Sequence, residues 1–217
     1  MAKAFSNRYM LLYAAALVTV AALLLTIVSV SLKPRQERNK AAEQKQMILK
    51  TIGVEASRDN AAELFEQYFT VGESPNGSSA EEDIHGGTPL HYDGGIVIPI
   101  QGSGLWGPIW GYLALDSNAT VVGAVFDHQG ETPGLGGEIA TDKFAARFIG
   151  KRMDSQPICL KKNADNNNPY QVDVISGATM TSNGVTEMLE QAYENYKNLI
   201  TPNIQSNQID FRKEAVQ

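Results

Sequence analysis

An uncharged apolar run near the N-terminus constrains this chain more than any other feature. It extends from Tyr9 to Val30 without a charged residue. A helix of about twenty residues, each rising about 1.5 Å, matches a bilayer core of about 30 Å. We therefore predict one transmembrane helix at residues 9–31. A cleaved signal peptide is the alternative, although its apolar region usually covers only about 7 to 15 residues.

Composition limits what the rest of the chain can be. The formal net charge is -6, from 18 Lys and Arg against 24 Asp and Glu, so we expect no nucleic-acid surface. A single cysteine, Cys159, excludes an internal disulfide. No Cys or His cluster has metal-ligand spacing, so we expect no metal site and interpret His85, His91 and His128 as solvated or structural. The remaining length suits one domain with a hydrophobic core.

Residues 32–58 are rich in helix formers and predict a stalk helix or linker, with Pro34 at its junction with the membrane segment. Asn60 is placed to cap a following helix at 61–69. Short β-branched segments then predict an antiparallel sheet with a hairpin turn at Asp116-Ser117-Asn118. Its expected strands are 96–101, 110–115 and 120–127.

The other segments complete an α+β domain. Residues 71–95 lack periodicity and indicate a long surface loop. We expect a helix at 141–148, a strand at 157–161 and a polar turn at 165–169. Ser182 is placed to cap the last helix. The prediction is a mainly antiparallel sheet flanked by helices, in a domain at 59–200 with a C-terminal tail at 201–217.

The segment from Asp173 to Ser182 presents several hydroxyls on a turn of small residues, directly ahead of that last helix. Gly177 and Ala178 remove side-chain bulk, and a helix N-terminus attracts anions through its unpaired N–H groups and its dipole. A phosphate group needs this arrangement. A helix start rich in Ser and Thr, without a ligand, is the alternative.

Two glycine-rich loops also point to a ligand. In the first, glycines frame Leu105 and Trp106, and this tryptophan fits either a core position or the wall of a site for a ring-shaped ligand. In the second, at 131–137, several glycines permit close backbone approach by a flat ligand, with a plain turn as the alternative.

Asp173, followed by Ser176-Gly177-Ala178-Thr179, resembles the acceptor motif at which a flavin transferase attaches FMN to threonine through a phosphoester bond. Gly104-Leu105-Trp106, the loop Glu131-Thr132-Pro133-Gly134-Leu135-Gly136-Gly137 and the segment Thr181-Ser182-Asn183-Gly184-Val185 accompany it. Together they are similar to the C subunit of the sodium-translocating NADH:quinone oxidoreductase, from the membrane segment to about Ile200.

The resemblance implies covalent FMN on Thr179, with Asp173 recognised by the transferase. Thr181 offers the same nucleophilic atom two residues farther on. The resemblance also implies that both glycine-rich loops line the flavin pocket, and it implies no catalytic residue. The cofactor-binding residues expected are Ser176, Gly177, Ala178, Thr179, Thr181, Ser182, Leu105, Trp106, Glu131, Thr132, Pro133, Gly134, Leu135 and Gly136.

The function implied is an electron relay within a complex that oxidises NADH, reduces quinone and exports sodium, with the other subunits, A, B, D, E and F, as partners. Residues 1–8 are then cytoplasmic, and the flavin domain lies on the periplasmic side of the cell inner membrane. More Lys and Arg follow the membrane segment than precede it, which favours the opposite orientation. The chain has no NADH-binding fingerprint, so catalysis belongs to the assembly.

Two alternatives remain from the sequence. The G subunit of the Rnf-type ion-translocating oxidoreductase shares the Gly-Ala-Thr acceptor and the Glu-Thr-Pro-Gly-Leu-Gly loop. A membrane-tethered scaffold without a cofactor would use the acceptor turn only as a helix start.

Overall fold

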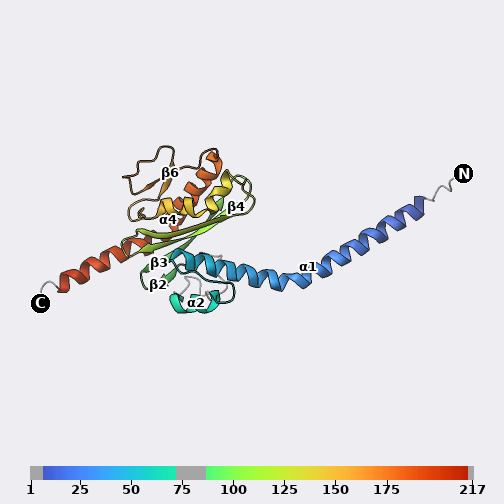
Figure 1. Ribbon diagram of the computed structural model, residues 1–217, viewed down its shortest axis with the longest axis horizontal. Coiled ribbons are helices and arrows are strands. Elements are labelled where there is room, and N and C mark those ends of the chain that lie inside the picture. Colours follow the sequence, from blue (N-terminus) through green and yellow to red (C-terminus); the bar gives the residue numbers. More distant parts are fainter. Residues whose placement is uncertain (1–6, 72–86, 215–217) are drawn as a thin grey trace. The chain divides into compact units, whose positions relative to one another are not determined.

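The computed structural model describes the backbone of residues 7–71 and 87–214, and the side chains of residues 7–69 and 87–200. The chain divides into two units between Glu43 and Gln44. Helix α1, Asn7–Thr51, supplies the first unit and the start of the second (Figure 1). The two units are described separately.

The N-terminal part of α1 exposes apolar side chains around its whole circumference. Leu11, Leu12 and Leu25 are each 72% exposed. Within the described residues, α1 is the one helix long and apolar enough to cross a membrane. Pro34 lies inside this helix and does not end it. The helix expected after the membrane segment is therefore continuous with it as far as Thr51.

A five-stranded antiparallel sheet forms the centre of the second unit, and its strand order follows the chain. In the hairpin between the last two strands, Asp116 Oδ1 accepts hydrogen bonds from the backbone N–H groups of Asn118 and Thr120, both at 2.8 Å. The predicted sheet and hairpin are confirmed. The strands are β1 Thr70–Val71, β2 Leu90–Tyr92, β3 Gly95–Ser103, β4 Pro108–Asp116 and β5 Val121–His128.

Helices cover both faces of this sheet. Helix α4, Thr179–Glu214, packs on one face through its residues up to Ile200, together with η1 Gly136–Ala140, α3 Asp142–Ala145 and η2 Ala146–Phe148. The last turns of α1 and helix α2, Ala61–Tyr68, pack on the other (Figure 1). The α+β prediction of a sheet flanked by helices is thereby confirmed.

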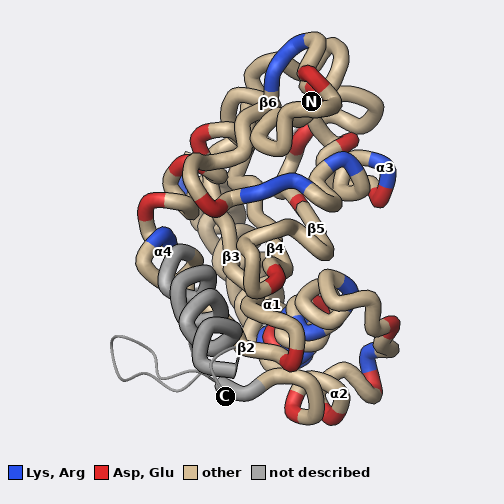
Figure 2. The backbone as a smooth tube through the Cα atoms, turned by 90° about the vertical axis from the view of Figure 1, so that its left-hand side faces the viewer, with Lys and Arg blue, Asp and Glu red and all other residues tan. Residues whose placement is uncertain are grey.

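Strand β3 contributes side chains to the two hydrophobic cores, one on each face of the sheet. Ile96, Ile98 and Ile100 join the core under α4, whereas Val97 joins the core formed with α1 and α2. Alternate residues of a strand point to opposite faces, so a strand covered on both sides reads as a nearly continuous apolar run. The strand contains no charged residue, and charges lie mostly on the segments around it (Figure 2).

A second, two-stranded sheet leads to the segment from Asp173 to Ser182, which is called the acceptor segment after the motif that it resembles. Strand β6, Cys159–Lys161, pairs in parallel with β7, Gln171–Asp173. A polar turn lies between them, and in it the Asn168 N–H donates to the Asp165 carbonyl at 2.9 Å. The strand at 157–161 and the turn at 165–169 were predicted. Strand β7 was not, because three residues in a polar context carry too little pattern.

Three other local predictions require correction. Residues 71–95 do not form one loop, since they contain β2; residues 72–86 lie outside the described part. Asn60 lies at the N-cap position of α2, but its side chain makes no capping hydrogen bond, because its Oδ1 accepts instead from the Ser57 backbone N–H at 2.7 Å. The helix expected at 141–148 begins as α3 and tightens into the 3-10 turn η2.

Glycines allow α4 to lie directly against β3. A Cβ atom added to Gly184 would lie 2.2 Å from the carbonyl oxygen of Ser103, and one added to Gly102 would lie 2.8 Å from the Cβ atom of Met188. No side chain fits between these backbones. The contact holds the start of α4 beside the end of β3, where the first glycine-rich loop begins.

Gly184→Ala is expected to lower the free energy of unfolding by about 1–3 kcal/mol, because the backbone oxygen of Ser103 cannot move aside. This loss exceeds the preference of about 1 kcal/mol that alanine has over glycine in a helix. Thermal unfolding of the full chain in detergent measures the change. The control is Asn183→Ala at the exposed neighbouring position. An unchanged melting temperature for Gly184→Ala would contradict the close contact.

Candidate functional site

The acceptor segment leaves β7 and turns sharply into α4. Gly177 adopts φ +77°, a left-handed conformation that glycine accepts without steric cost. The Ala178 N–H then donates to the Ile175 carbonyl at 3.1 Å, and α4 begins at Thr179. The predicted turn of small residues ahead of a helix is therefore present, with Ser176 and Gly177 exposed and Ala178 buried.

Burial distinguishes the two candidate acceptor threonines. Thr179 is exposed in the first turn of α4. Thr181 is only 2% exposed, and its hydroxyl donates to Glu131 Oε2 at 2.6 Å. The two hydroxyls lie two residues apart on a helix, which places them on different sides of it. Only the Thr179 hydroxyl is open to an incoming group.

Ser182 does not cap α4 as predicted. The helix begins three residues earlier, and the Ser182 N–H already donates to the Ala178 carbonyl at 2.9 Å. The buried Ser182 hydroxyl accepts instead from the Ile175 N–H at 3.1 Å. The turn ends soon after the left-handed Gly177, and α4 begins three residues before Ser182, so Ser182 lies inside α4. From there its hydroxyl holds the backbone of the turn at Ile175. It does not face the site.

The Glu131 carboxylate joins the two glycine-rich loops to α4. Its Oε1 accepts from the Trp106 backbone N–H at 2.8 Å, and its Oε2 accepts from Thr181. Glu131 is 4% exposed. A Cβ added to Gly104 would lie 2.5 Å from Oε1, and one added to Gly136 would lie 2.3 Å from Oε2. These glycines are therefore required by the close approach of the loops to the carboxylate.

The same contacts keep this buried carboxyl ionised. Burial raises the pKa of Glu131, but the hydrogen bond from Thr181 and those from the backbone N–H groups of Trp106 and Leu105 lower it. The nearby His128 lowers this pKa further, and the net result lies below the ordinary 4.5. His128 Nδ1 also accepts from the Glu131 N–H at 3.2 Å, which confirms a structural role for this histidine. Glu131 therefore supports the loops, and each of its carboxylate oxygens is hydrogen-bonded within the protein.

Around the acceptor turn, the loops expose apolar side chains. Trp106 is 69% exposed and Leu105 51%, so the alternative of a core position for Trp106 is excluded. Leu135, 43% exposed, lies beside the turn: its Cδ2 is 3.0 Å from where a Cβ on Gly177 would stand. Met180 is 59% exposed. Thr132, Pro133 and Gly134 are also exposed, whereas Gly136 is buried.

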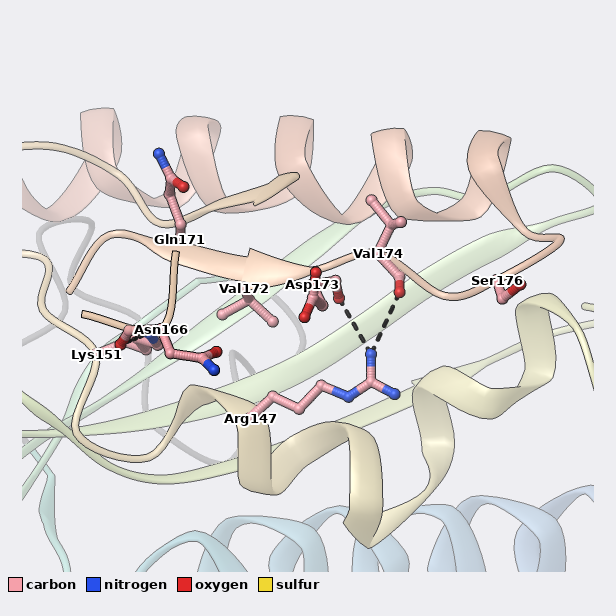
Figure 3. A pocket seen from close by; sticks show the side chains of 8 residues that line it. All are labelled: Arg147, Lys151, Asn166, Gln171, Val172, Asp173, Val174 and Ser176. Carbon is pink, nitrogen blue, oxygen red and sulfur yellow. Dashed lines mark hydrogen bonds between the residues drawn. The ribbon is translucent and has the colours of Figure 1, made fainter. Parts of the chain in front are cut away.

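The side chains of two further residues form hydrogen bonds at the start of the acceptor segment. Asp173, which was predicted, is exposed, and its Oδ1 accepts from the Ala164 N–H at 2.9 Å. Arg147 was not predicted, and its Nη1 donates to the carbonyls of Asp173 at 3.1 Å and Val174 at 3.4 Å (Figure 3). An arginine on an amphipathic segment gives no local signal of such a contact, because long charged side chains are ordinarily solvated there.

Comparison with known proteins places this geometry in a family. Residues 104–194 match the FMN-binding domain family. The C subunit of the Na(+)-translocating NADH-quinone reductase of Chlamydia caviae is 40% identical over 136 residues, which cover 53% of this chain and 43% of that protein. The same subunit of Vibrio vulnificus is 28% identical over 210 residues, covering 76% and 82%.

A solved structure decides the assignment. The crystal structure of the C subunit from Parabacteroides distasonis is 30% identical and superposes with a TM-score of 0.65, covering 78% of this chain and 97% of that one. The chain belongs to this C-subunit family. Its relatives are named as part of an NADH-quinone reductase, which is an oxidoreductase. In this member of the C-subunit family, the FMN-binding domain contains both glycine-rich loops and the acceptor segment.

Glu131→Gln is expected to lower the free energy of unfolding by about 1–3 kcal/mol at neutral pH, because it removes a buried, hydrogen-bonded charge. Since the folded pKa of Glu131 is lowered, its contribution is present above pH 4.5 and is lost as the pH falls through the folded pKa. Melting temperatures across this range measure the difference from wild type.

The matched control is Glu138→Gln, which removes the same charge from a half-exposed position in η1. It should leave the melting temperature nearly unchanged. A deficit in Glu131→Gln that is as large in acid as at neutral pH would contradict the ionised state of Glu131.

Proposed function

We propose that this chain carries FMN bound covalently, through a phosphoester, to the Thr179 side chain. The observation that supports this most directly is the difference between the two threonines: Thr179 is exposed, whereas Thr181 is buried and bonded to Glu131. The acceptor motif and the FMN-binding domain family at 104–194 support the same cofactor.

The residues around Thr179 suit such a group. The first N–H groups of α4 and the helix dipole favour a phosphate at this position. Leu105, Trp106, Leu135 and Met180 offer exposed apolar surface to a flat ring. Gly134 leaves open space at this surface, because nothing lies within 4 Å of where its Cβ would stand. Bound FMN would supply the redox chemistry, and these side chains would fix its position and surroundings.

Attachment requires a separate enzyme. The new bond joins Thr179 Oγ1 to the FMN phosphorus, and a phosphoanhydride bond of the donor must break to supply the energy. A flavin dinucleotide fits, with AMP as the leaving group. A threonine hydroxyl is a poor nucleophile without a base, and no histidine occurs between Asp173 and Val185. We assign the base that takes the hydroxyl proton to a flavin transferase, which would recognise the exposed Asp173.

The loaded chain would serve as an electron relay in a membrane complex. We infer that it takes electrons from one redox centre and passes them to another, between NADH oxidation and quinone reduction, coupled to sodium export. The other subunits, A, B, D, E and F, would be its partners. The names of the relatives support this placement over the G subunit of the Rnf-type complex. A cofactor-free scaffold would purify without flavin absorbance, even from cells with an active transferase.

Thr179→Ala is expected to abolish covalent flavin while leaving the fold intact, because an exposed hydroxyl contributes little to stability. Thr179→Ser keeps the nucleophilic oxygen and should keep the flavin. Fluorescence of the denatured chain in a gel, after co-expression with the transferase, measures both. Thr181→Ser, which preserves the hydrogen bond to Glu131, is the control and should be labelled fully. Retention of flavin by Thr179→Ala would contradict the assignment.

We also propose that α1 anchors the chain in the cell inner membrane, with the flavin domain in the periplasm. Protease added to intact spheroplasts should then digest the domain, and a cytoplasmic protein in the same cells serves as the control. Protection of the domain until the membrane is opened would support the orientation that the positive charges after the apolar run favour.

A further inference from the structure

The acceptor segment is poorly supported on one side. A cleft of about 470 Å³ runs along β7 and the residues after it (Figure 3). Val172 and Ile175 anchor this segment in the core on its other side, but on the side of the cleft its backbone has no packed neighbour and depends on individual hydrogen bonds. The residues that line the cleft are Arg147, Lys151, Asn166, Gln171, Val172, Asp173, Val174 and Ser176.

Arg147 reaches across this space to the acceptor backbone. Its Nη1 lies 3.1 Å from the Asp173 carbonyl oxygen and 3.4 Å from that of Val174. The guanidinium carbon lies 5.5 Å from the ring centroid of Phe144, which is 1% exposed. A guanidinium resting on a fixed aromatic ring loses little further freedom when it donates hydrogen bonds. Arg147 thus links the core at Phe144 to the backbone of the acceptor segment.

Other contacts hold the N–H side of the same peptides. The Val174 N–H donates to the Lys161 carbonyl at 3.3 Å, and the Ile175 N–H donates to the Ser182 hydroxyl. With Arg147 on the carbonyls, both sides of this short stretch are fixed just before the exposed Ser176 and Gly177. The stretch sets the direction in which the chain enters the turn, and hence the place of Asp173 relative to Thr179.

We propose that Arg147 is a positioning residue for the transfer of FMN to Thr179. It holds the segment from Asp173 to Thr179 in the one arrangement that a flavin transferase accepts. The proposal rests on the proposed function of Thr179. Removing Arg147 would let the segment move into the cleft, and the transferase would meet the competent arrangement in only a fraction of the molecules.

This mechanism predicts a particular kinetic effect. A substrate that is competent in only about one tenth of its molecules has an apparent KM raised about tenfold, with kcat unchanged at saturation. Arg147→Gln should therefore raise the KM of the transferase for this chain about tenfold. Arg147→Lys keeps a charge and a donor and should recover part of the loss. The measurement uses the full-length chain in detergent, purified transferase and FAD, with fluorescence of the denatured chain as readout.

Lys143→Gln is the matched control, because it removes one positive charge from the exposed side of α3. It should leave KM and kcat unchanged. Hydrogen exchange of the full chain gives a second readout: amides at 174–178 should exchange faster in Arg147→Gln while those of β3 and β4 do not. Should Arg147→Gln fail to fold, Arg147→Lys tests the same prediction.

The outcomes separate the two proposals. If wild type is labelled at Thr179 and Arg147→Gln is labelled with the same KM, the positioning role is wrong and the flavin assignment stands. A lower kcat at unchanged KM would likewise overturn positioning, since it would indicate an effect on the reacting atoms. If wild type is not labelled at all, both proposals fail.

Discussion

The arrangement of the site depends on the hydrogen bonds that the buried carboxylate of Glu131 accepts. The carboxylate accepts hydrogen bonds from the backbone of the first glycine-rich loop and from Thr181 in α4, while itself belonging to the second loop. A buried carboxylate without hydrogen-bond partners would destabilise the folded state. The need to satisfy this carboxylate therefore fixes the positions of the two loops and of α4 relative to one another. Gly104 and Gly136 follow from this, because a side chain at either would collide with the carboxylate.

One consequence of this network is a difference in accessibility between two identical functional groups. The bond that satisfies Glu131 also withdraws the Thr181 hydroxyl from solvent, which leaves Thr179 as the reachable threonine of the turn. The same arrangement leaves Leu105, Trp106 and Leu135 exposed at the surface, where they would give the proposed flavin ring an apolar support. The contacts that stabilise the loops therefore also set which threonine is accessible.

Much of this could be predicted where the information is local in sequence. The apolar run, the hairpin at Asp116 and the acceptor turn each lie within one continuous stretch of the sequence. The contacts that organise the site are long-range. Glu131 and Thr181 are 50 positions apart. Arg147 donates to a backbone carbonyl, which every residue has, so the sequence cannot indicate this partner. The capping prediction for Ser182 is wrong because the left-handed Gly177 starts the helix earlier than a capping pattern indicates.

The central claim is that the fold presents Thr179, and not Thr181, for covalent attachment of FMN. Peptide mass spectrometry on the denatured chain, purified from its native membranes, tests it most directly. The account predicts a peptide that carries the mass of FMN less one water, with fragmentation placing it on Thr179. An unmodified chain from cells with an active transferase, or a flavin on Thr181, would contradict the account.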